Sequence, residues 1–62
     1  MYTDRTTENL RFMLWANLQS VLRLDDIIDR SNDEEHRQSV IKHRAELQQE
    51  CDAIRAELNR RA

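Results

Sequence analysis

Apolar positions in the first half of the chain recur at alternating spacings of three and four residues. The series comprises Leu10, Leu14, Val21, Leu24 and Ile28, with the amide Asn17 completing it. This spacing is typical of a coiled-coil seam on an amphipathic helix. We therefore predict one long helix over about residues 4–29, with Thr3 and Thr7 as candidate starts. Asn17 either fixes register and partner number within the seam or points to its rim.

The apolar pattern stops after residue 29 and resumes in a second helical segment. Ser31 and Glu34 have the spacing of a capping box, and Asn32 and Glu35 repeat it one residue later. We predict a turn over about residues 30–33, with Ser31 as the cap, and a second helix over about residues 33–59. One face of that helix carries Val40, Leu47, Cys51, Ile54 and Leu58, together with His36 and His43.

Two long helices joined by a short turn predict an all-α fold, an antiparallel two-helix hairpin that forms a single domain over residues 1–62. A hairpin buries one stripe of each helix, whereas the first helix is apolar over more than one stripe. We therefore expect two hairpins to dimerise into a four-helix bundle. The predicted dimer and core seam consists of Leu10, Leu14, Asn17, Val21, Leu24, Ile28, Val40, Leu47, Cys51, Ile54 and Leu58.

Composition narrows the classes of function. The 62 residues contain no glycine and no proline, which excludes glycine-rich phosphate loops and nucleotide-binding turns. Cys51 is the only cysteine, so an internal disulfide is impossible and a cytoplasmic location is expected. No signal peptide or membrane span is predicted, and a chain with net charge -2 is not expected to coat DNA.

Two groups of residues are candidate metal sites by their composition and spacing. Asp25, Asp26 and Asp29 have the Asp-Asp-x-x-Asp spacing that holds magnesium in prenyl-transferring helical enzymes, but 62 residues cannot enclose the cavity those enzymes need. His36 and His43 lie about 10.5 Å apart along one helix, too far to share an ion. The pattern favours core or rim histidines paired with a carboxylate such as Glu50 or Glu46, and a site shared across the dimer stays open. We expect no cofactor, no metal and no small-molecule substrate.

A catalytic role is not expected either. The sequence offers no serine, histidine and acid set in a defined relation, and Cys51 is predicted to lie inside the seam. We therefore expect the protein not to be an enzyme.

Aromatic residues lie off the predicted seam of the first helix. Phe12 and Trp15 share this flank with Leu22, and the predicted partner-binding residues are Arg11, Phe12, Trp15, Gln19 and Arg23. Exposed rings among arginines are typical of protein-binding surfaces. The alternative is that a second layer of the bundle buries Trp15 and Leu22.

The run His43-x-x-Glu46-Leu47-x-x-x-Cys51 resembles the Rop family of plasmid-encoded RNA modulators, as does Asn9-Leu10-Arg11-Phe12 followed by Gln19. The likeness covers about a dozen positions and needs gaps around the turn. It implies a dimeric four-helix bundle in which Arg5, Arg11, Phe12 and Gln19 contact paired RNA loops.

A second segment, Gln48-Gln49-Glu50-Cys51-Asp52, is similar to the Ser-Gln-Glu-Leu-Asp signature of the small hairpin phosphatases of sporulation response regulators. Only Gln49, Glu50 and Asp52 agree with it.

The sequence thus favours a small regulatory or inhibitory protein of the phage or plasmid accessory kind. We expect it to act as a homodimer by binding a partner protein through its outer helix faces. Rop-like binding of structured RNA is the alternative, and response-regulator dephosphorylation is a remote one.

Overall fold

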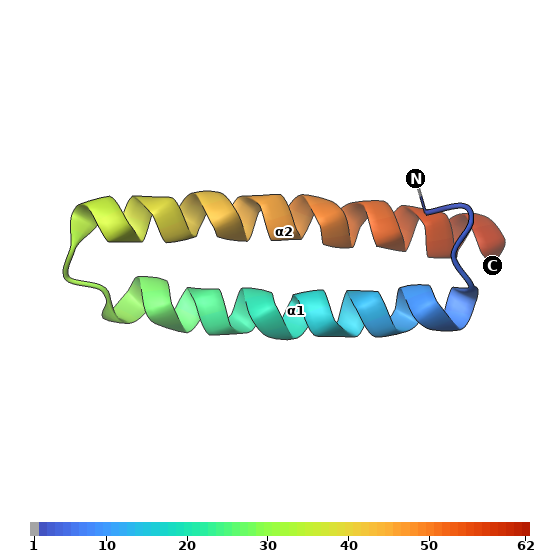
Figure 1. Cartoon of the computed structure of the whole chain (residues 1–62), viewed down its shortest axis with the longest axis horizontal. Coiled ribbons are helices and arrows are strands. Elements are labelled where there is room, and N and C mark those ends of the chain that lie inside the picture. Colours follow the sequence, from blue (N-terminus) through green and yellow to red (C-terminus); the bar gives the residue numbers. More distant parts are fainter. Residues whose placement is uncertain (1) are drawn as a thin grey trace.

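The computed structural model describes residues 2–62, which form two antiparallel helices and no strand. Helix α1 spans Thr7–Arg30 and helix α2 spans Glu34–Arg61. The helices lie side by side, with the turn at one end and both chain termini at the other (Figure 1). The molecule measures 42 × 16 × 15 Å. The predicted all-α two-helix hairpin is confirmed.

Helix α1 begins at Thr7, three residues after the approximate start at residue 4. The hydroxyl of Thr6 accepts a hydrogen bond from the Asn9 amide at 3.0 Å, and Thr6 itself has an extended backbone. A threonine in this position satisfies one of the amides that the first helical turn leaves without a carbonyl partner. The preceding residues form a separate turn, in which the Arg5 amide bonds to the Tyr2 carbonyl.

The residue that caps α2 is Asp33, so the predicted capping box of Ser31 and Glu34 is wrong. A carboxylate oxygen of Asp33 accepts from the amides of Glu35 at 3.0 Å and His36 at 3.3 Å. Ser31 instead ends α1, where its amide donates to the Ile28 carbonyl, and its hydroxyl donates to the Asp33 carbonyl. The Glu34 carboxylate accepts from Gln38 rather than reaching back to the turn. A full negative charge beside the positive end of the helix dipole favours Asp33 over a hydroxyl.

The turn is made without any left-handed backbone. Ser31 and Asp33 are both extended, and none of the described residues has a positive φ. Glycine is therefore not required at this reversal, which agrees with its absence from the chain.

The hairpin has a thin apolar core. Leu10, Val21, Cys51 and Ile54 are the buried residues. The other residues of the predicted seam are half-buried, namely Leu14, Asn17, Leu24, Ile28, Val40, Leu47 and Leu58. One stripe of each helix thus faces the other helix, and the remaining apolar surface of α1 stays open to solvent.

Polar contacts link the two halves of the chain at both ends of this core. Toward the turn, Arg44 of α2 forms an ion pair with Asp25 of α1. At the other end, the Arg61 guanidinium donates to the carbonyls of Tyr2 and Thr3 and to the Thr7 hydroxyl. We call this second set of contacts the Arg61 clasp. It fastens the segment before α1 to the last turn of α2.

Candidate interaction surface

The side chains predicted to bind a partner all lie exposed on α1, outside the stripe that packs against α2. We define the outer face of α1 by the residues Arg11, Phe12, Trp15, Gln19, Leu22 and Arg23. Phe12, Trp15 and Leu22 are 64%, 59% and 63% exposed. Phe12 and Trp15 lie on neighbouring turns and Leu22 about two turns further along, so these open apolar side chains form a patch along the helix rather than single exposed residues.

The aromatic pair gives this patch a defined shape. The rings of Phe12 and Trp15 lie 6.2 Å apart between centroids, at an interplanar angle of 34°. They are three residues apart on a regular helix, which places them on neighbouring turns of one face. The backbone beneath both rings is already ordered in the helix, which lowers the conformational entropy that binding would cost.

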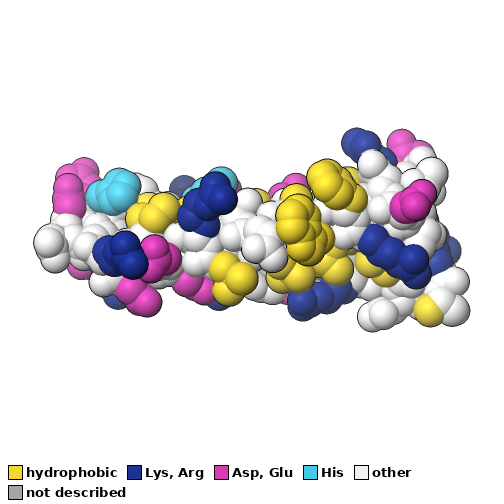
Figure 2. All heavy atoms as spheres, turned by 90° about the horizontal axis from the view of Figure 1, so that it is seen from below, with side chains coloured by type: hydrophobic (Ala, Val, Ile, Leu, Met, Phe, Trp, Pro, Cys, Tyr) yellow, Lys and Arg dark blue, Asp and Glu magenta, His cyan; other side chains and the backbone are white. Residues whose placement is uncertain are grey.

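Apolar and acidic side chains gather in different parts of the surface seen from the α1 side. Figure 2 shows hydrophobic side chains along the middle of this surface and several acidic side chains toward the turn end. Arg11 and Arg23 flank the apolar patch, and neither has an ion-pair partner among residues 2–62. Their guanidinium groups are thus free to donate hydrogen bonds to another molecule.

Two of the acidic residues near the turn form ion pairs with arginines of the same chain. Asp25 pairs with Arg44, and Asp26 pairs with Arg30 at 3.1 Å. Within residues 2–62, no three histidine, cysteine or acidic side chains gather closely enough to hold one metal ion.

Both histidines lie outside the core of the hairpin, at the rim of the apolar face of α2. His36 and His43 are exposed. Helix α1 covers only the stripe of α2 that contains Cys51 and Ile54, and the histidines lie beyond the edge of that stripe. A hollow of about 340 Å³ at the turn includes His36, with Asp26, Ile27, Arg30 and Ser31 as its other lining residues.

Cys51 is fully buried between the helices, and this burial raises the pKa of its thiol. A thiol that is both inaccessible and protonated is a poor nucleophile. In the segment that is similar to the phosphatase signature, Gln49 and Glu50 are exposed, and Gln48 donates to Asp52 at 3.2 Å.

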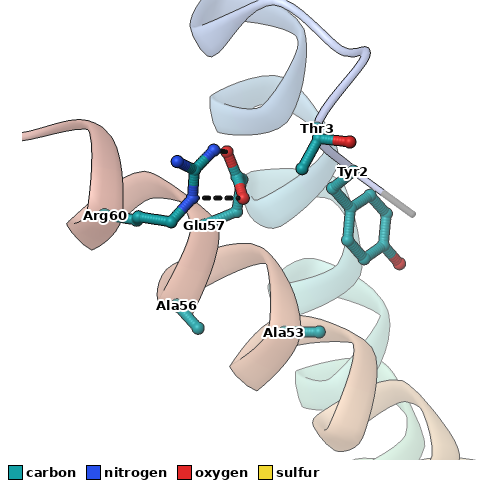
Figure 3. Close-up of a pocket in the computed structure, with 6 residues that line it drawn as sticks. All are labelled: Tyr2, Thr3, Ala53, Ala56, Glu57 and Arg60. Carbon is teal, nitrogen blue, oxygen red and sulfur yellow. Dashed lines mark hydrogen bonds and ion pairs between the residues drawn. The ribbon is translucent and has the colours of Figure 1, made fainter.

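A second hollow lies beside the Arg61 clasp, a set of contacts that the sequence pattern does not predict. Its volume is about 290 Å³. Figure 3 shows the residues that line it, which are Tyr2, Thr3, Ala53, Ala56, Glu57 and Arg60. Glu57 accepts hydrogen bonds from Arg60 and Arg61, which lower its pKa to about 2. The charges of Glu57, Arg60 and Arg61 are thus satisfied by one another, and the contacts around this hollow hold the two ends of the chain together.

Comparison with known proteins gave no match, since no family model, no curated protein and no solved structure met the threshold of similarity to this chain. Helices α1 and α2 both lack the long apolar stretch that crossing a membrane requires.

Proposed function

We propose that this chain is a small regulatory or inhibitory protein without enzymatic activity, which acts as a dimeric four-helix bundle in the cytoplasm. It binds a partner protein through the outer face of α1. The observation that supports this proposal is the exposed pair of Phe12 and Trp15 between two arginines that form no ion pair. Aromatic side chains and arginine dominate the energetics of protein interfaces.

Helix geometry makes this surface suited to a folded partner. The outer face runs along about three turns of α1, roughly 18 Å at 1.5 Å per residue. Such a strip matches a helix or groove of another protein, where rigid rings fill pockets and the arginines bond to carboxylates at the rim.

The decisive experiment compares capture of cellular proteins by the tagged chain and by matched variants. We expect one protein to be captured by the parent chain and lost with Phe12→Ala. Lys42→Ala serves as the control because Lys42 is exposed on α2. Circular dichroism establishes that each variant remains helical. Capture that Phe12→Ala leaves unchanged would contradict the proposal.

Treatment with nuclease separates the second candidate, binding of structured RNA. The exposure of Arg11, Phe12 and Gln19 on one helix is the observation that favours it, since an RNA site there needs these side chains accessible. Capture that survives nuclease and moderate salt supports a protein partner. Binding that disappears with nuclease and falls steeply as salt rises supports RNA.

A further inference from the structure

The single hairpin exposes more surface than a folded chain of its mass normally does. Its accessible surface is 4819 Å². A monomeric protein of 7.5 kDa is expected to expose about 4,250 Å², an excess of roughly 570 Å² for this chain. The excess reflects an elongated shape of 42 × 16 × 15 Å that leaves apolar side chains of α1 open. Two copies together carry an excess of about 1,100 Å², which pairing along one face would reduce.

A second stripe on α1 has the spacing of the hairpin seam. Each of its residues follows a seam residue by one position, so it repeats the alternating steps of four and three. We call it the side stripe: Arg11, Trp15, Leu18, Leu22, Asp25 and Asp29. One residue turns about 100° around a helix, so the side stripe faces nearly at right angles to α2. This is the direction in which a four-helix bundle places the next helix.

The exposure of the side stripe shows that the hairpin does not use it fully. Trp15 and Leu22 are the most open members of its apolar middle, and Leu18 between them is half-buried. Phe12, Gln19 and Arg23 of the outer face lie outside the side stripe. A molecule seated on the side stripe therefore leaves these three residues accessible.

The opposite charges at the two ends of the side stripe favour a second copy of the chain as the molecule that binds there, with its α1 helix antiparallel to the first. Arg11 lies at the end near the termini, and Asp25 and Asp29 lie at the end near the turn. A parallel pair of α1 helices would bring like charges together. An antiparallel pair centred on Ser20 places Arg11 opposite Asp29 of the second copy, and Leu18 opposite Leu22 of the second copy. The same register sets Trp15, whose indole N–H is a donor, against the Asp25 carboxylate, which pairs with Arg44 of its own chain through one oxygen and has a second oxygen to accept.

We propose that a second copy of the chain docks on the side stripe, with the two α1 helices antiparallel about a two-fold axis near Ser20. The inference rests on the proposed function only in taking the dimer as the acting form. It divides the outer face between two tasks. Arg11, Trp15 and Leu22 join the copies, and Phe12, Gln19 and Arg23 remain for the partner protein.

Charge exchange between the ends of the side stripe tests the pairing. Sedimentation equilibrium of the purified chain should show a dimer. Arg11→Glu alone and Asp29→Arg alone should each raise the dimer dissociation constant about tenfold, because each change affects two symmetric pairs. The dissociation constant of the double variant should return to within about twofold of the parent value. Arg23→Glu, outside the side stripe, should change the dissociation constant less than twofold.

Disulfide trapping tests the orientation. Arg11→Cys and Asp29→Cys chains, each made with Cys51→Ala, are mixed and oxidised. The antiparallel pair predicts mainly the mixed disulfide between positions 11 and 29, because only those positions meet within bonding distance. Disulfides of each variant with itself would overturn the orientation.

The two proposals fail separately. Single-charge variants that dimerise as well as the parent would overturn the second copy on the side stripe and leave Phe12-dependent capture untouched. A monomeric parent chain would overturn both this pairing and the dimeric form in the proposed function, while Phe12-dependent capture would still support the protein-binding face. An intact antiparallel dimer whose capture of protein ignores Phe12→Ala would overturn the proposed function alone.

Discussion

Asp33 is the side chain on which the start of α2 depends. Its carboxylate accepts two amide hydrogen bonds, and Glu34 and Glu35 add negative charge to the same helical turn. Backbone amides at a helix start have no carbonyl partners, so a side chain must replace them. No glycine is available in this turn to offer an alternative geometry.

Replacing Asp33 with alanine should lower the free energy of unfolding by about 1 kcal/mol, the usual value of a helix cap. Ser31→Ala is the matched change, and a smaller loss is expected because the Ser31 hydroxyl makes an exposed bond to one carbonyl. Urea denaturation at one fixed protein concentration measures both. A larger loss for Ser31→Ala than for Asp33→Ala would contradict this assignment of the cap.

The sequence could not distinguish these two caps. Ser31 with Glu34 satisfies the capping-box spacing, and the choice depends on where the chain leaves α1, which packing against α2 decides. The same reason explains the histidines. Helical spacing places His36 and His43 near the apolar side of α2, but the width of the stripe that α1 covers is a tertiary property.

At the scale of the elements, the two helices and their pairing were predictable. The alternating three and four spacing sets which stripe of α1 meets α2, and each residue of that predicted seam is buried or half-buried. The helix ends were less predictable. Helix α2 continues to Arg61, two residues beyond the approximate end at residue 59, where Arg61 bonds to Glu57 and to the segment before α1. Nothing local in the sequence signals a contact between residues 2 and 61.

Glu57, which accepts a hydrogen bond from the guanidinium of Arg61 in the clasp, makes this end of the hairpin sensitive to acid. Hydrogen bonds from Arg60 and Arg61 lower the pKa of Glu57 from 4.5 to about 2. A lowered pKa stabilises the fold above the unfolded value, and this contribution disappears as pH falls through the folded value. The stability advantage of the parent over Glu57→Gln should therefore be full above about pH 4.5 and vanish near pH 2.

Thermal unfolding in a pH series measures this difference. Glu46→Gln is the control, since Glu46 is exposed and has no ion-pair partner among residues 2–62. An advantage over Glu57→Gln that stays constant from pH 7 to pH 2 would show that the carboxylate does not hold the clasp.

At the scale of the whole molecule, the thin core and the open apolar surface of α1 have one cause, since a single hairpin buries only one stripe of each helix. Sequence patterning identified Phe12 and Trp15 as residues off the seam, and the hairpin leaves both exposed. It could not assign them to a docking surface or to a second layer of the bundle, because the same helical spacing serves both. Only the partner of the hairpin, a second copy or another protein, separates these two arrangements.

The three-residue turn also decides whether the protein is a hairpin at all. Ser31, Asn32 and Asp33 all have negative φ, and the residues on either side are already helical. Replacing these three residues with alanine removes both caps and offers the helix an unbroken path from residue 7 to residue 61. We expect such a chain to straighten into a rod about 80 Å long, against the present 42 Å. Small-angle X-ray scattering would report the change in maximum dimension. Each half of the rod would then pair with the complementary half of another copy, a domain-swapped assembly formed by losing a turn.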